Sequence, residues 1–178
     1  MRFVVAMTAV LACAPMARAE VTSAAPTAFV VTDTADTSAS APQVWQALGR
    51  IGAWWSPNHS YSGDPRHHMT LDRRAGGCFC ENWSGGSVEH ARVIASYEDE
   101  GVWTLRLGGA LGPLQDMALT GVLTFKIEPR PSGAHVTLTY RVTGEPGSNL
   151  DQIAAPVDSV TMEQLTRLVR YAETGAPS

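Results

Sequence analysis

Hydrophobic and polar residues alternate along much of this 178-residue chain, which is the pattern of half-buried β-strands. The alternation begins at Phe29–Thr37 and returns late in the chain, at Leu119–Glu128 and Ala134–Thr143. Further strands are predicted at Met69–Arg74, Cys78–Trp83, Ser87–Tyr97 and Val102–Leu107. Because the strands follow one another without helices between them, we expect an antiparallel sheet.

Helical patterns occur in two parts of the chain. Ser40 is a favourable N-cap for a short helix that ends at Gly49, and a second short helix is predicted over Ile51–Ser56. The longest helix is predicted over Leu150–Tyr171, with Pro156 inside it. An interior proline costs about 3 kcal/mol. We therefore expect a kink at Pro156, or a short helical turn followed by a main helix that starts there.

A run of strands with helices in only two places predicts an α+β domain with a curved antiparallel sheet. Strands of this length are expected to wrap around the C-terminal helix, an arrangement that tends to enclose a cavity. One domain over residues 28–172 fits the usual size range. Residues 20–27 are small and are predicted to form a flexible leader, and residues 173–178 a tail.

The first residues have the features of a secretory signal peptide. Phe3–Cys13 is almost wholly apolar but shorter than the ~20 residues that span a bilayer. The A-x-A sequence formed by Ala17, Arg18 and Ala19 then provides a cleavage site, so residues 1–19 are predicted to be removed and the mature chain to be periplasmic or secreted. Lipidation at Cys13 is the less favoured alternative, because Leu11 fits a lipoprotein motif poorly at its position.

The charge of the chain argues against two classes of partner. Removing Arg2 and Arg18 with the signal peptide lowers the formal net charge from −4 to −6, and Lys126 is the only lysine. Nucleic acids and anionic membrane surfaces both need clustered cations, so neither is an expected partner. We expect no membrane-spanning segment in the mature chain, which is predicted to be a monomer or a weak dimer.

Two cysteines remain in the mature chain, Cys78 and Cys80, on the same face of a predicted strand. Alternate residues of a strand lie roughly 6.5–7 Å apart, which is near the limit for a disulfide. We favour two small side chains that pack side by side, and a disulfide stays open as the alternative in an oxidising compartment. No metal site is expected here, because further ligands are missing nearby.

Several segments together resemble the START-like (SRPBCC) superfamily. They are Ala41–Leu48, Trp54–His59, Ala75–Glu81, Gly121–Phe125 and His135–Tyr140. The order of one strand, two short helices, six strands and a long helix is also similar to this superfamily, which includes polyketide cyclase/dehydrase-like proteins, plant pathogenesis-related allergens and Hsp90 ATPase activators. The chain looks like a bacterial exported member. The resemblance implies a helix-grip fold with a cavity under the long helix, and it supplies no fixed catalytic set.

Glu81 is the first candidate for chemistry. Phe79, Glu81 and Trp83 share one face of their strand, and this aromatic face is expected to point inward. A carboxylate in an apolar interior needs a partner, or its pKa rises through desolvation. Two roles stay open: a structural ion pair with Arg92 or Arg106, or an acid–base group in the cavity.

Histidines supply the other catalytic candidates. His90, on a neighbouring strand, would form an acid–base pair with Glu81 if it faced inward, but the alternation around it is ambiguous and an exposed position is favoured. His59 is expected near the mouth of the pocket. His59, His67 and His68 share one loop, yet their spacing matches no compact ligand motif, so neither a metal site nor a cofactor is predicted.

The cavity itself is expected to be lined mainly by aromatic side chains. Five tryptophans are many for one domain, and indoles bury a large area while keeping one N–H donor. The predicted ligand-binding residues are Trp54, Trp55, His59, Phe79, Glu81, Trp83, Trp103, Met117 and Tyr140.

Three functions follow from these patterns. The favoured one is binding of a small hydrophobic or aromatic molecule between sheet and helix. The first alternative is a cyclase- or dehydrase-type enzyme with Glu81 as general acid/base. The second is a protein-interaction module like the Hsp90 ATPase activators. No phosphate-binding loop, nucleophile elbow or zinc-protease helix motif is present in the sequence.

Overall fold

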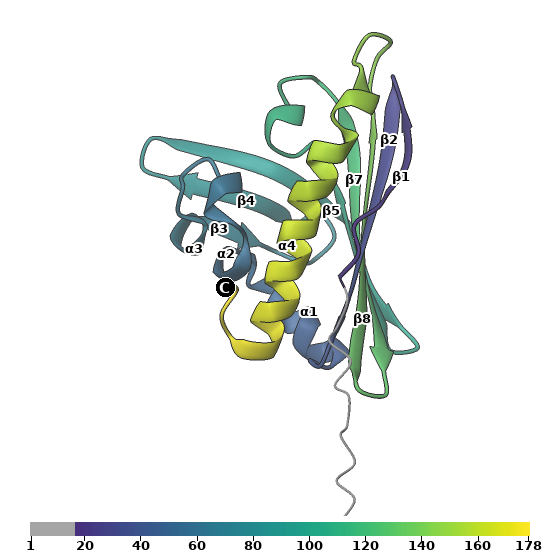
Figure 1. Cartoon of the computed structure of the whole chain (residues 1–178). Coiled ribbons are helices and arrows are strands. Elements are labelled where there is room, and N and C mark those ends of the chain that lie inside the picture. The colour runs from purple at the N-terminus through teal and green to yellow at the C-terminus, as the bar shows by residue number, and fades with distance from the viewer. Residues whose placement is uncertain (1–16) are drawn as a thin grey trace, which may run out of the picture.

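An antiparallel sheet of eight strands bends around one long helix in residues 17–178, the part of the chain that this computed structural model describes (Figure 1). The strands are β1 Val21–Ala25, β2 Ala28–Thr37, β3 Met69–Leu71, β4 Cys78–Trp83, β5 Gly86–Asp99, β6 Val102–Gly108, β7 Thr120–Arg130 and β8 Gly133–Thr143. Their order across the sheet is β1-β2-β8-β7-β6-β5-β4-β3. The sheet therefore begins and ends with its shortest strands, which leaves little unpaired edge.

The helices lie on the concave side of this sheet (Figure 1). They are α1 Ala41–Gly49, α2 Ile51–Trp54, α3 Pro65–His68 and α4 Ala154–Thr174, with 3-10 turns η1 Pro57–His59, η2 Gly112–Leu114 and η3 Leu150–Gln152. At the start of α1 the Ser40 N–H donates to Gln43 Oε1 over 2.8 Å, which satisfies one of the free donors at a helix start. The long helix α4 crosses the sheet and packs mainly on β2.

Two irregularities in β5 divide the sheet into two arms. The strands β2, β8 and β7 pair without interruption, whereas β5 carries His90 as an extra residue opposite β4 and Ile94 as an extra residue opposite β6. Such bulges bend a strand and increase its twist. In Figure 1 the arm with β3, β4 and β5 accordingly projects away from the arm with β1, β2, β7 and β8, and α4 lies between the two.

The predicted α+β helix-grip architecture is confirmed, with differences at both ends of the chain. The leader is not loose, because Val21–Ala25 pairs with β2 as an edge strand. Arg18, in the segment predicted to be removed, forms a separate bridge to Thr34. At the other end, the expected short helical turn followed by a main helix is confirmed, because η3 precedes α4. The helix starts at Ala154 rather than at Pro156, so the proline lies in its first turn, where proline is tolerated. The expected apolar signal segment and Cys13 lie outside the described residues.

Within residues 17–178, no helix combines the length and apolar character needed to cross a membrane.

Candidate ligand-binding pocket

A pocket of about 590 Å³ lies between α4 and the concave face of the sheet. This volume falls in the range of small-molecule sites in proteins. The floor is made by three side chains of the central strands, Leu123, Leu138 and Tyr140. The rim is made by the two loops that approach α4, residues 58–61 and residues 111–117, together with Trp55.

One face of α4 and the turn before it form the wall opposite the sheet. Ile153, Val157, Val160, Thr161 and Gln164 recur at helical spacing, so they project from the same side. Most of these side chains are only partly buried, unlike Leu165 and Leu168, which are inaccessible to solvent. The helix therefore uses one stripe to hold the core and a neighbouring stripe to line the pocket.

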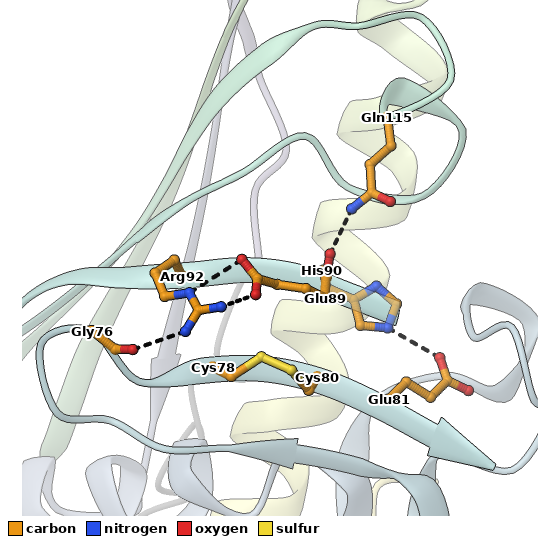
Figure 2. Close-up of a disulfide and its surroundings, with 8 residues drawn as sticks. All are labelled: Gly76, Cys78, Cys80, Glu81, Glu89, His90, Arg92 and Gln115. Atoms are coloured by element: carbon orange, nitrogen blue, oxygen red, sulfur yellow. Dashed lines mark hydrogen bonds and ion pairs between the residues drawn. A yellow bond between two sulfur atoms is a disulfide. The ribbon is translucent and has the colours of Figure 1, made fainter. Parts of the chain in front are cut away.

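The loop around η2 is tied to the sheet at two points. The Leu111 N–H donates to the Tyr140 hydroxyl over 2.9 Å, and that hydroxyl donates to the Gly109 carbonyl over 3.1 Å. Gln115 Nε2 donates to the Glu89 carbonyl over 2.8 Å (Figure 2). Burial raises the pKa of Tyr140 to about 12, against a smaller lowering by the Leu111 N–H, so this phenol stays protonated. These hydrogen bonds hold the loop in place as part of the pocket rim.

A buried pair of ionisable side chains, Glu81 and His90, lies at one side of the pocket. His90 Nε2 is 3.0 Å from Glu81 Oε2, and the two side chains are 4% and 0% exposed (Figure 2). Glu81 also accepts the backbone N–H groups of Tyr61 at 3.0 Å and Ser62 at 2.7 Å. His90 lines the pocket, and Glu81 lies behind it.

Opposing effects set the charge states of this pair. Burial raises the pKa of Glu81, but the hydrogen bonds from Ser62, Tyr61 and His90 outweigh it, so the pKa lies below its ordinary value. Burial lowers the pKa of His90, and Glu81 raises it only in part, so the net shift is downward. Glu81 is therefore a carboxylate and His90 a neutral imidazole at pH 7. With Nε2 donating to Glu81, the lone pair is on Nδ1.

The bulge in β5 explains why His90 faces inward. A regular strand would place Glu89 and Ala91 on one face and His90 on the other. The extra residue shifts this alternation, so His90 and Ala91 are both buried while Glu89 and Arg92 are both exposed. The predicted exposed position of His90 is therefore wrong.

The partner expected for Glu81 also differs from the prediction. Arg92 lies on the outer face, where it pairs with Glu89 and donates to the Gly76 carbonyl over 3.1 Å (Figure 2). Within residues 17–178, Arg106 forms no ion pair or hydrogen bond with Glu81. The carboxylate is instead held by one imidazole and two backbone N–H groups.

Polar groups at the mouth are already engaged with one another. His59 Nε2 is 3.1 Å from Glu163 Oε2, and the Trp55 indole N–H donates to the His59 carbonyl over 2.7 Å. Deeper in the wall, Gln164 Oε1 accepts the Ser56 N–H over 2.9 Å. These contacts connect α4 to the segment after α2 across the pocket opening.

The predicted ligand-binding residues fall into two groups. Four of them line the pocket: Trp55, His59, Met117 and Tyr140. The other five lie outside its wall: Trp54, Phe79, Glu81, Trp83 and Trp103. The four aromatic side chains of this group pack against other rings: Trp103 on Trp45, Phe79 on His90, Trp54 on Trp55 and Trp83 on Tyr61. Glu81 is held by the hydrogen bonds described above.

Sequence reasoning missed the polar residue of α4 that faces the pocket. Gln164 is 1% exposed and, apart from Thr161, the helix stripe to which it belongs is apolar, so its spacing is the signal that would have identified it as a wall residue. The Tyr61 and Ser62 N–H groups left no such signal, because backbone donors are invisible in a side-chain pattern.

The two cysteines form a disulfide, so the favoured prediction of two separate thiols is wrong (Figure 2). Their Cα atoms are 5.4 Å apart, closer than ideal strand geometry would give and within the range of disulfides. Glu89 lies near both sulfurs, but bonded sulfurs offer no thiolate to a metal ion. The disulfide lies on the outer face of β4, opposite the face that carries Phe79 and Glu81.

Comparison with solved structures places this architecture among known folds. Human STARD10 superposes with a TM-score of 0.57 at 6% identity, covering 92% of this chain and 71% of that chain. CalU16 from Micromonospora echinospora gives 0.54 at 17% identity, covering 93% and 88%. The chain has the START-like helix-grip fold.

A norcoclaurine synthase from Thalictrum flavum, solved with a transition-state analogue, shares this START-like fold. It superposes with a TM-score of 0.50 at 12% identity, covering 84% of this chain and 97% of that chain. No protein-family model and no curated protein matches the sequence. Identities this low carry the fold and leave function to the residues of the pocket.

Proposed function

We propose that this protein binds a small, largely apolar molecule in the pocket beneath α4. The observation that carries the proposal is the lining, in which leucine, isoleucine, valine, methionine and aromatic side chains from sheet, helix and rim converge on one space of about 590 Å³. Burying apolar ligand surface there contributes roughly 25 cal/mol per Å². The norcoclaurine synthase of the same fold, which was solved with a transition-state analogue, supports a small molecule as the occupant.

A fluorescent probe tests this proposal directly. N-phenylnaphthylamine is neutral and apolar, and its emission rises on transfer from water to an apolar site. We expect saturable binding to the wild type and its loss in Val160→Trp, because the new indole would occupy the pocket. Ser159→Trp, which adds the same side chain on the exposed face of α4, should bind like the wild type. Equal binding by both variants would contradict a site under the helix.

Acid–base catalysis is a second candidate, favoured by the Glu81–His90 pair. A neutral imidazole whose Nε2 is held by a buried carboxylate presents Nδ1 as a base, and His90 lines the pocket. If a ligand carries an acidic C–H or O–H group near this nitrogen, His90 accepts the proton and Glu81 stabilises the resulting imidazolium. General bases in this setting contribute typically 10²–10⁴-fold to a rate.

Nitrobenzisoxazole is a suitable probe because its ring opening needs only a base in an apolar site. The base removes the ring proton, the N–O bond breaks, and a coloured cyanophenolate forms. We expect wild-type turnover above that of His90→Gln. The control His135→Gln changes a histidine that pairs with Asp36 outside the pocket. Turnover that persists in His90→Gln would leave binding as the only supported function.

We also propose that the mature chain is exported, as the apolar segment Phe3–Cys13 and the A-x-A cleavage site at residues 17–19 suggest. A Cys78–Cys80 disulfide supports this location, since such bonds persist in oxidising compartments. Expression of the full chain followed by N-terminal sequencing of the periplasmic fraction should give Glu20 as the first residue. An intact N-terminus in the cytosolic fraction would contradict export.

A further inference from the structure

One polar group in the pocket wall lacks a partner. Gln164 is 1% exposed, and its amide nitrogen Nε2 is fully shielded from solvent without a hydrogen-bond partner anywhere in residues 17–178. Buried donors in native proteins are nearly always paired, and leaving one unpaired costs free energy. Because Gln164 lines the pocket, a molecule bound in the pocket is the candidate partner for this nitrogen.

The orientation of this amide is determined by its other end. Gln164 Oε1 accepts the buried Ser56 N–H over 2.9 Å. Exchanging the oxygen and nitrogen would set two donors against each other, because a backbone N–H cannot accept a hydrogen bond. The NH2 group is therefore the end without a partner, and the site needs an acceptor rather than a donor.

Hydroxyl groups in the wall keep free lone pairs, but none lies within hydrogen-bond distance of Gln164 Nε2, and their own protons are engaged elsewhere. The Tyr140 hydroxyl is shared between Leu111 and Gly109, and the Ser60 hydroxyl donates to the Pro57 carbonyl over 3.1 Å. The Thr161 hydroxyl, one turn before Gln164, is directed to the helix carbonyls of residues 157 and 158. Among the described residues that line the pocket, Gln164 is therefore the one whose buried amide nitrogen has no acceptor.

We propose that Gln164 determines the specificity of the pocket by donating to a carbonyl oxygen of an otherwise apolar ligand. The inference rests on the proposed binding function and names its ligand class: ketones, esters or amides rather than plain hydrocarbons. A hydrocarbon of the same shape would leave the amide nitrogen buried and unpaired, so discrimination of about tenfold or more is expected.

Two isosteric probes separate this inference from the binding function itself. Methyl naphthyl ketone and isopropenylnaphthalene have the same size and shape and differ only in a carbonyl oxygen replaced by a methylene group. Isothermal titration calorimetry of the wild type should show the ketone binding about tenfold tighter. Equal affinities would overturn the role of Gln164 while leaving the proposed function intact. Binding of neither probe would count against the proposed function itself.

A substitution then assigns the preference to one residue. Gln164→Met keeps an unbranched side chain of similar length and removes the amide, so the hydrocarbon should still bind and the ketone should lose its advantage. Gln152→Met makes the same replacement at an exposed position outside the pocket and should keep the wild-type ratio. A ketone preference that survives in Gln164→Met would refute the assignment. If that variant does not fold, the wild-type comparison of the two probes still decides whether the pocket selects an acceptor.

Discussion

A buried carboxyl group beneath α4 gives the sharpest test of the energetics of this fold. Asp33 lies on the inward face of β2, is 0% exposed, and has no hydrogen-bond partner for either carboxyl oxygen in the described part of the chain. Burial raises the pKa of Asp33 from 3.8 to about 7, and nearby Asp158 adds to the rise. The nearby Thr161 hydroxyl lowers the pKa but offsets only part of this rise.

The sign of the pH dependence follows from proton binding. Between pH 4 and pH 7 the folded protein keeps a proton on Asp33 that the unfolded chain releases, so the free energy of unfolding falls as pH rises through this window. A pKa that moves from 3.8 to about 7 corresponds to at most about 4 kcal/mol, at 1.36 kcal/mol per unit. Above pH 7 the free energy of unfolding is lower by this full amount.

Asp33→Asn removes the ionisation and adds an amide donor near Asp158, whose Oδ1 is also buried without a partner among residues 17–178. We expect the variant to be more stable than the wild type at pH 8, by up to about 4 kcal/mol, with an advantage that shrinks toward pH 4. Urea unfolding followed by tryptophan fluorescence across this range measures the difference. Asp99→Asn, at the exposed end of β5, should show no such trend. A difference that is independent of pH, or a variant that is less stable at pH 8, would refute the reasoning.

Three further predictions concern the pocket and the disulfide. Glu81→Gln should lower the pKa of His90 further, because the carboxylate is what raises it against burial; an NMR titration of the imidazole measures the shift, and an unchanged value would contradict the pairing. Replacing both Cys78 and Cys80 by serine should cost at most about 1.5 kcal/mol, because the closed loop is only three residues long; urea unfolding with and without a reductant checks this, and a much larger loss would contradict the loop-entropy argument. Tyr140→Phe leaves a rim N–H without its acceptor and should cost about 1–3 kcal/mol, with faster amide exchange confined to the η2 loop. Uniform exchange across the sheet would instead indicate a general loss of packing.

The regular strands could be predicted because their side chains report a buried face every second residue. The strand β8 alternates between buried and partly exposed positions along its whole length, as its sequence suggests. The strand β1 carries small residues that are mostly exposed, so its pattern contains no such signal. It is held by backbone pairing with β2, which side-chain chemistry does not encode.

The candidate site was predictable only where side-chain patterns agree with regular geometry. Glu81 and Phe79 follow strict alternation, and both were correctly expected inside. His90 was placed outside because one extra residue shifts the alternation in β5. The helical spacing of Gln164 indicates a wall residue, but nothing in the sequence shows that its amide nitrogen lacks a partner.

The two extra residues of β5 have a consequence for how this protein could be redesigned. Each of them, His90 and Ile94, adds about 3.3 Å to the length of β5 and nothing to the paired strand. This difference in length forces the sheet to bend at both positions. The angle between the two arms, and with it the space left under α4, is thereby encoded in the number of residues as well as in their size. Deleting His90 or Ile94 should flatten the sheet and narrow the pocket beneath α4. No substitution at the pocket wall would reproduce this change.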